Sequence, residues 1–322
     1  MDIFWLLLGL GLILGGAEWL TDGASAIAKK WGVSDLVIGL TVVAFGTSTP
    51  ELSIGLISAF KGNAPLAIGN VVGSNIFNIF VIIGIVAMVR PIKIQPSVLS
   101  TEIPFVILAS FALLAIGCGP WLGVKGVPII NRPDGILLFL FFLIFMRYTF
   151  AQAKGAAPND ASAISAAEKP VMSLWKAIGM VIVGLGALVY GGDRFVAGAS
   201  GIASSLGMSE ALIGLTIVAA GSSLPELATS IVAATKGKTG IAIGNVIGSN
   251  IFNIFMVLGI TATVRPLSFG DIDEWDLIVM TGASILFWIF GRRFGHTVIN
   301  RWEGGILLAC YLAYIAWQVM SS

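Results

Sequence analysis

Two glutamates stand in the middle of long apolar segments, and their surroundings match. Glu51 ends the motif Gly-Thr-Ser-Thr-Pro-Glu at 46–51, and Glu226 ends Gly-Ser-Ser-Leu-Pro-Glu at 221–226. A carboxylate at the centre of a lipid-spanning helix costs about 3 kcal/mol or more, so such a residue indicates a functional site. The alternative, a purely structural ion pair, is disfavoured because no Lys or Arg lies within either apolar segment.

The residues around each glutamate offer oxygen ligands for a cation. Two hydroxyl residues lie three and four positions before each glutamate, where a helix places all three on one face. The proline directly before each glutamate lacks an N–H, so the helix should break or kink there and free backbone carbonyl oxygens. The second helical segment then begins near the glutamate, whose charge suits the positive end of that helix. The hydroxyl residues are Thr47 and Ser48 in the first motif, and Ser222 and Ser223 in the second.

A second motif also occurs twice, as Gly-Asn-Val-Val-Gly-Ser-Asn-Ile-Phe-Asn at 69–78 and Gly-Asn-Val-Ile-Gly-Ser-Asn-Ile-Phe-Asn at 244–253. In each copy an Asn, a Ser and an Asn follow at a spacing of four, along one helix face. Small polar faces also let membrane helices pack closely, and this interpretation is favoured for Asn70, Asn75, Asn245 and Asn250. The predicted ligands are Ser74, Asn78, Ser249 and Asn253.

The predicted ligands are all oxygens, without sulfur or imidazole, and this set selects hard cations. Ca²⁺ in particular takes about 6–8 oxygens in flexible geometry. Two carboxylates can neutralise one Ca²⁺ or two Na⁺, but they cannot neutralise Ca²⁺ and Na⁺ bound at the same time. Because an empty site would leave two uncompensated charges in a low dielectric, the pattern favours antiport over uncoupled flux.

The composition places this site in a membrane. The 322 residues are 57% hydrophobic and 11% charged, with a mean hydropathy of +0.97, which excludes a water-soluble enzyme. The formal charge of +1 gives no basic field for nucleic acid. Cys118 and Cys310 are expected to be free thiols, His296 a solvated loop residue, and the first apolar run a retained helix rather than a signal peptide.

Ten apolar runs are long enough to cross a bilayer, and they do not alternate as barrel strands would. One linker, 152–170, separates five runs from the next five and is expected to be cytoplasmic. We therefore predict an all-α polytopic membrane protein with a first repeat at 1–151 and a second at 171–322. The runs are 3–28, 33–60, 64–89, 98–118, 134–151, 171–196, 208–235, 239–264, 276–291 and 302–320.

The two halves repeat each other. Adding 175 to each position of 39–91 gives its partner in 214–266 without a gap, and 32 of the 53 pairs are identical. Since each half has an odd number of spans, the second half should be inverted, as in transporters that bind substrate near mid-membrane. Ser34 and Asp35, like Ser209 and Glu210, are expected to cap helix starts. Glu18 and Asp193 occupy matching positions, for which we weigh an ion-access role against capping or interfacial hydration.

The basic residues predict the orientation. Thirteen of the 18 Lys and Arg residues fall in the linker and the other connections on its side, and five on the opposite face. By the positive-inside rule the linker side is cytoplasmic, so both termini should lie outside the inner membrane.

At this point the motifs resemble those of the sodium/calcium exchangers, in the cation/calcium exchanger superfamily, whose inverted repeats carry both motifs. The resemblance covers the chain and implies Na⁺/Ca²⁺ exchange by alternating access. The linker of about 19 residues has no room for a calcium-sensing domain, which favours a prokaryotic type. We expect no cofactor and no protein partner, and a chain that acts as a monomer. The resemblance also implies carbonyl ligation at Ala44 and Ala219 and sliding of the first helix of each half. Asn253 replaces the acidic residue of potassium-dependent relatives, which argues against K⁺ cotransport.

Two alternatives remain. A Ca²⁺/H⁺ antiporter of the same superfamily would need only titratable carboxylates, whereas the paired hydroxyls suit Na⁺. A cation channel is disfavoured because channels usually form rings of subunits around an axis normal to the membrane.

Overall fold

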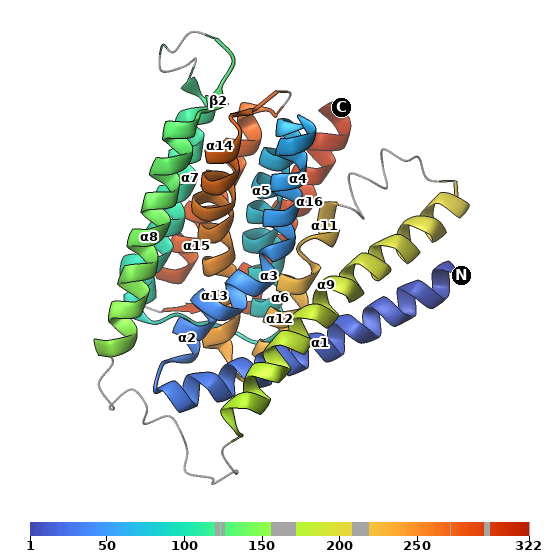
Figure 1. Ribbon diagram of the computed structural model, residues 1–322, viewed down its shortest axis with the longest axis vertical. Helices are drawn as coiled ribbons and strands as arrows, with labels where there is room; N and C mark the ends of the chain where they lie inside the picture. Colours follow the sequence, from blue (N-terminus) through green and yellow to red (C-terminus); the bar gives the residue numbers. More distant parts are fainter. Residues whose placement is uncertain are drawn as a thin grey trace. The chain divides into compact units, whose positions relative to one another are not determined.

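The computed structural model describes residues 1–119, 123, 126–155, 172–207, 219–270, 272–292 and 297–321, which are mostly helical (Figure 1). Within these ranges, eight helices are long and apolar enough to span a membrane, and segments 35–47 and 49–61 add one broken span. The chain is therefore an all-helical polytopic membrane protein. The first half contains α1 (Asp2–Trp31), α2 (Asp35–Ile38), η1 (Gly39–Val43), α3 (Ala44–Thr47), α4 (Thr49–Lys61), α5 (Ala64–Phe77), η2 (Asn78–Ile83), α6 (Gly84–Val89), η3 (Val98–Glu102), α7 (Ile103–Gly117) and α8 (Arg132–Gly155).

The second half contains α9 (Leu174–Ser205), α11 (Ala219–Gly221), α12 (Leu224–Thr235), α13 (Thr239–Ile251), η7 (Phe252–Leu258), α14 (Gly259–Val264), α15 (Glu274–Arg292) and α16 (Arg301–Ser321). The segments labelled η are π-helical turns that continue neighbouring α-helices. The predicted spans 64–89 and 239–264 have the observed limits, and both are largely buried. Elsewhere the limits differ by a few residues, except that α9, which includes the charged pair Asp193 and Arg194, continues past 196 to Ser205.

Several sequence predictions fall outside the described residues. The predicted span 208–235 is described only from Ala219 onward, and Ser209, Glu210 and His296 are not covered. The same holds for most of the linker, since α8 extends to Gly155 and the description resumes at 172. By contrast, the predicted cap at Ser34 is confirmed, because its hydroxyl accepts a hydrogen bond from the N–H of Val37 at 3.3 Å.

The chain divides into two compact units. Unit 1 comprises Met1–Thr47 and Met146–Gly248, and unit 2 comprises Ser48–Phe145 and Ser249–Ser322. Each unit therefore contains parts of both halves of the sequence.

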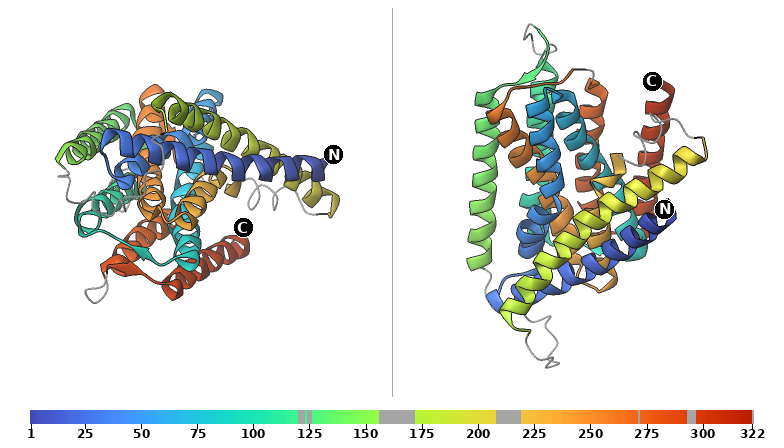
Figure 2. Two further views of the ribbon diagram at one scale, coloured as in Figure 1. Left: turned by 90° about the horizontal axis from the view of Figure 1, so that it is seen from below. Right: turned by 45° about the vertical axis from the view of Figure 1, so that its right-hand side comes forward.

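In unit 1, the two longest helices, α1 and α9, lie side by side and run in opposite directions (Figures 1 and 2). A Cβ on Gly16 would lie 2.7 Å from the carbonyl oxygen of Gly184, and a Cβ on Gly9 would lie 2.7 Å from that of Gly191. Only glycine allows the backbones to come this close. The contacts recur every seven residues along each helix.

In unit 2, two short sheets connect the sequence halves. Strand β1 (Ile92–Lys93) pairs antiparallel with β4 (Val298–Ile299), and β2 (Ile129–Ile130) pairs antiparallel with β3 (Leu267–Ser268). Each sheet takes one strand from each half. Helices of the two sequence halves also pack together in this unit, since α6 of the first half packs against α16 of the second.

Candidate ion-binding site

Both proline-containing motifs break their helices at matching positions. The first chain segment leaves helical geometry at Ser48, between α3 and α4, where φ is −84° and ψ is 6°. The second does so at Ser223, before α12, where φ is −92° and ψ is 5°. The predicted breaks are thus confirmed, and the two serines share one backbone conformation although 175 residues separate them.

Each candidate glutamate lies in the first turn of the helix that restarts after the break. Glu51 is in the first turn of α4 and Glu226 in the first turn of α12. Both side chains are 1% exposed. At this end the unpaired N–H groups of a helix carry partial positive charge, which stabilises a carboxylate that water does not reach.

In unit 1, Asn245 connects the first broken helix to the second. Thr47 donates its hydroxyl hydrogen to Oδ1 of Asn245 at 3.1 Å. The amide nitrogen of Asn245 donates to the backbone carbonyl of Glu226 at 3.3 Å and to the hydroxyl of Ser230 at 3.1 Å. The close-packing interpretation favoured for Asn245 is therefore incomplete, since this side chain also joins Thr47 to the backbone of Glu226.

In unit 2, four asparagines from the second motif contact one another across the repeats. Asn78 donates to Oδ1 of Asn250 at 2.9 Å, and Asn253 donates to Oδ1 of Asn75 at 3.1 Å. Asn75 also donates to the backbone carbonyl of Asn250 at 3.3 Å. Within this unit, α4 packs against α5 and η7, so the elements that carry Glu51, Asn75 and Asn253 are neighbours.

Three predicted cation ligands in unit 2 each have a buried oxygen atom without a hydrogen-bond partner among the described residues. The atoms are Oδ1 of Asn78, Oδ1 of Asn253 and Oγ of Ser249. Oxygens of this kind can coordinate a hard cation. 

The twelve predicted ligands are distributed equally between the units. Ten of them are buried, and Ser222 is half-buried. Unit 1 contains Ala44, Thr47, Ala219, Ser222, Ser223 and Glu226. Unit 2 contains Ser48, Glu51, Ser74, Asn78, Ser249 and Asn253.

Among the residues that the structure describes, two further acidic side chains are buried. Glu102, at the end of η3, is fully buried, and Glu303 is 2% exposed. Glu303 accepts a hydrogen bond from the N–H of Asn300 at 2.7 Å and so caps α16. Glu102 lies near the start of the predicted span 98–118, outside both repeated motifs. Its matching position is Leu277, so the repeat gave no signal for it.

The unresolved pair Glu18 and Asp193 lies in a polar environment. Their side chains are 59% and 62% exposed. Glu18 lies 3.5 Å from the ammonium of Lys236, and Asp193 forms an ion pair with its neighbour Arg194. This exposure fits the interfacial interpretation better than a place among buried ligands.

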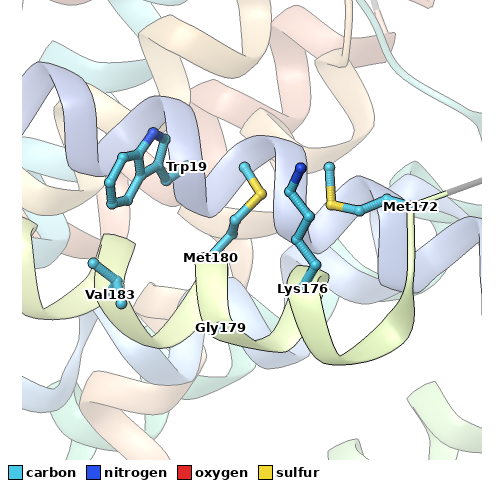
Figure 3. A pocket seen from close by; sticks show the side chains of 6 residues that line it. All are labelled: Trp19, Met172, Lys176, Gly179, Met180 and Val183. Carbon is cyan, nitrogen blue, oxygen red and sulfur yellow. The ribbon is translucent and has the colours of Figure 1, made fainter.

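A shallow apolar groove between α1 and α9 lies apart from the predicted ligands. Figure 3 shows Trp19 of α1 beside Met180 of α9, with Lys176 further along α9 next to Met172, and none of the twelve predicted ligands lines this groove. It carries no oxygen cluster that could hold a cation.

The apolar helices, two of which are interrupted at matching prolines beside buried glutamates, define a multi-pass membrane protein. Comparison with known proteins specifies the class. The family of the sodium/calcium exchanger protein matches residues 1–151 and 176–320, and the chain belongs to this family. Its members are transporters rather than enzymes, and their transported ions are Na⁺ and Ca²⁺.

Individual relatives are similar over nearly their whole length. The sodium/calcium exchanger MaX1 of Methanosarcina acetivorans is 33% identical over 96% of both chains. The inner membrane protein YrbG of Escherichia coli is 36% identical over 97% of this chain and 96% of its own. A solved structure of the sodium-calcium exchanger NCX_Mj, soaked with 10 mM Na⁺ and without Ca²⁺, is 32% identical, covers 98% of both chains and has a TM-score of 0.82.

Proposed function

We propose that this chain is a secondary active antiporter that exchanges Na⁺ for Ca²⁺ by alternating access. Both ions would compete for one mid-membrane site built around Glu51 and Glu226. Family membership and the similarity to MaX1 and NCX_Mj support the choice of ions. The other proposed ligands are Ala44, Thr47, Ser48, Ser74, Asn78, Ala219, Ser222, Ser223, Ser249 and Asn253.

The observation that carries this proposal is the matched placement of the two glutamates. Each is 1% exposed and stands in the first turn after a helix break. A cation provides the countercharge that makes two such carboxylates tolerable in a low dielectric. One Ca²⁺ or two Na⁺ balances the two negative charges, whereas an empty site leaves both uncompensated. The empty transporter should therefore change conformation slowly, and this couples the two ion fluxes.

The hydroxyls favour Na⁺ over H⁺ as the coupling ion. Proton coupling requires only that the carboxylates titrate. Thr47 and Ser48, with Ser222 and Ser223, add neutral oxygens beside each carboxylate, and Na⁺ and Ca²⁺ use these as ligands.

We further propose that ten spans form two inverted repeats, 1–151 and 171–322, joined by the linker 152–170. The antiparallel pairing of α1 with α9 supports this arrangement, since the glycine contacts are related by a shift of 175: Gly9 matches Gly184, and Gly16 matches Gly191. The exchanged strand pairs in unit 2 support it as well.

The proposed location is the inner membrane, with both termini outside and the linker in the cytoplasm. The excess of Lys and Arg on the linker side supports this orientation. A monomer has all twelve proposed ligands, so exchange requires no protein partner.

The experiment is Ca²⁺ uptake into proteoliposomes that hold the purified protein. An outward-directed Na⁺ gradient should drive saturable ⁴⁵Ca²⁺ uptake, with and without K⁺. Uptake that follows a pH gradient and ignores Na⁺ would instead identify a Ca²⁺/H⁺ antiporter, and flux without counterflow would identify a channel.

Glu51→Gln and Glu226→Gln should each abolish this uptake while the protein remains folded in the membrane. Glu18→Gln is the matched control, because Glu18 is more than half exposed and should leave uptake within about twofold of the original rate. Normal uptake by either buried variant would remove that glutamate from the proposed site.

A further inference from the structure

Asn75 and Asn250 occupy matching positions in the two repeats, and both are 1% exposed. Each accepts a hydrogen bond at Oδ1 from an asparagine of the other repeat. The Nδ2 of Asn78 lies 2.9 Å from Oδ1 of Asn250, and the Nδ2 of Asn253 lies 3.1 Å from Oδ1 of Asn75. A shift of 175 converts one bond into the other with the repeats exchanged, so the same interaction is formed twice.

These two bonds fix the orientation of the donor amides. A side-chain amide has one oxygen acceptor and one NH₂ donor, and a rotation of half a turn about its terminal bond exchanges them. Since the NH₂ groups of Asn78 and Asn253 face Oδ1 acceptors, their own Oδ1 atoms face elsewhere. Both of those oxygens are buried and lack a hydrogen-bond partner among the described residues.

Such an arrangement has an energetic cost that a ligand can offset. A buried acceptor without a partner loses the hydrogen bonds that water gave it. A carbonyl-type oxygen in this state is suited to coordinate a hard cation, and amide oxygens are regular Ca²⁺ ligands.

The backbone at Asn78 and Asn253 also departs from regular α-helical geometry. The π-helical turn η2 begins at Asn78, and η7 begins at Phe252, next to Asn253. Single π-helical turns within α-helices occur frequently at functional sites. In addition, Nδ2 of Asn75 donates to the backbone carbonyl of Asn250 at 3.3 Å. This bond holds the two acceptor residues, Asn75 and Asn250, next to each other.

We propose that Asn75 and Asn250 are positioning residues, which do not bind the cation but hold Asn78 and Asn253 with their amide oxygens available to it. The identity of the cation as Ca²⁺ rests on the proposed function. Without the Oδ1 acceptor, an amide can turn and present its NH₂ group to the ion, and that contact is repulsive.

The test uses Asn250, because its side-chain oxygen Oδ1 accepts the hydrogen bond from Asn78 that the proposal depends on. Asn250→Leu keeps the side-chain shape and removes the acceptor, whereas Asn250→Asp keeps an oxygen in place. Ca²⁺ affinity is measured by equilibrium binding of ⁴⁵Ca²⁺ to the purified full-length protein in Na⁺-free buffer. Asn250→Leu should raise the Kd about tenfold, and Asn250→Asp should raise it by no more than about threefold.

A double-mutant cycle separates positioning from general damage. Asn78→Ala alone should weaken Ca²⁺ binding, and adding Asn250→Leu should weaken it no further, because the residue to be positioned is gone. Ser284→Ala is the matched control. It removes a buried contact between α7 and α15, from Ser284 to Ser110 at 3.0 Å, and should leave the Kd unchanged.

The outcomes distinguish this inference from the proposed function. An unchanged Kd for Asn250→Leu, equal losses for the Asp and Leu variants, or additive losses in the cycle would overturn the positioning role. Monodisperse elution of each variant verifies folding, and Asn250→Ala replaces the Leu variant if that one aggregates. Because binding is measured without Na⁺, Na⁺-independent uptake by the original protein would overturn the proposed coupling and leave this result standing. A protein that binds no Ca²⁺ at all would overturn both.

Discussion

Thr47 donates its hydroxyl hydrogen to Oδ1 of Asn245 at 3.1 Å, and the same amide donates to the backbone carbonyl of Glu226 at 3.3 Å. One asparagine thus connects the residue before the first helix break with the glutamate after the second. The contact lies within unit 1, where it fixes the restart of α12 relative to the end of α3.

Replacement of this connecting residue should destabilise the protein. Asn245→Leu removes the acceptor for Thr47 and the donor for Ser230 in a fully buried location, so we expect a loss of about 2 kcal/mol in the free energy of unfolding. Thermal or denaturant unfolding in detergent measures it. Thr263→Val is the control, because Thr263 bonds only to the carbonyl of Gly259 in its own helix among the described contacts. Equal stabilities of the two variants would contradict the prediction.

Glycines on α1 differ sharply in what a side chain would meet. A Cβ at Gly16 would lie 2.7 Å from the carbonyl oxygen of Gly184, whereas one at Gly15 meets nothing within 4 Å. Gly16→Val should therefore separate α1 from α9, at a cost of about 1–3 kcal/mol or more, and should lower Ca²⁺ uptake severely. Gly15→Val should retain most of the uptake. Uptake assays on equal amounts of reconstituted protein measure the difference, and similar rates for both variants would refute the packing argument.

Ion pairs connect α1 to the chain just after α12. The ammonium of Lys236 lies 2.9 Å from a carboxylate oxygen of Asp22, and that of Lys238 lies 3.2 Å from the other. All three side chains are partly exposed, so each pair is worth about 0.5 kcal/mol and is weakened by salt.

Asp22→Asn should therefore lower the thermal midpoint slightly at low ionic strength, and the difference should disappear in concentrated choline chloride. Lys61 is the matched control, since it occupies the position equivalent to Lys236 and has no ion pair among the described residues. Lys61→Gln should not move the midpoint at either salt concentration. A salt-independent effect of Asp22→Asn would show that the ion pairs are not its cause.

Both cysteines are free thiols, as predicted, and Cys118 is buried just beyond the end of α7. Burial raises the pKa of the Cys118 thiol, and the negative charge of Glu274 raises this pKa further. Only the thiolate is alkylated, so a raised pKa lowers the reactive fraction at neutral pH and moves the onset of reaction to higher pH.

In a Cys310→Ala background, labelling by iodoacetamide should be slow at pH 7 and should accelerate above the ordinary thiol range. Glu274→Gln removes one cause of the shift and should move the rate profile to lower pH, while Asp273→Asn should move it less. Mass spectrometry of the alkylated peptide gives the rates. A profile unaffected by Glu274→Gln would leave burial as the sole cause.

The helix breaks and the buried glutamates could be predicted from the sequence because their causes are local. Pro50 and Pro225 each remove a backbone N–H from the helix that contains them. A carboxylate in the middle of a long apolar segment cannot reach water without removing that segment from the membrane. Because the motifs are repeated, the sequence also predicts that the two breaks and the two glutamates occupy matching positions. The limits of the spans 64–89 and 239–264 were predictable for the same reason, since Asn63 and the paired Arg-Pro sequences bound them.

The roles of the remaining asparagines could not be predicted in this way. In the sequence, Asn75 and Asn250 belong to small polar helix faces that suggest close packing. Only the tertiary contacts reveal that both residues accept hydrogen bonds from the other repeat. Burial of Glu102 likewise depends on neighbours that are distant in sequence. The division into two units was also hidden, because each unit combines segments from both halves.

The exchanged strands have a consequence for the order in which the protein is made. When the ribosome has completed 1–151, β1 and β2 already exist as sequence, but their partners β4 and β3 have not been synthesised. The same is true of α1, whose close glycine contacts all wait for α9. The first half therefore lacks these contacts until the second half arrives. Maturation is thus a late event in translation, and a chain truncated after α8 should be recognised by membrane quality control as unassembled.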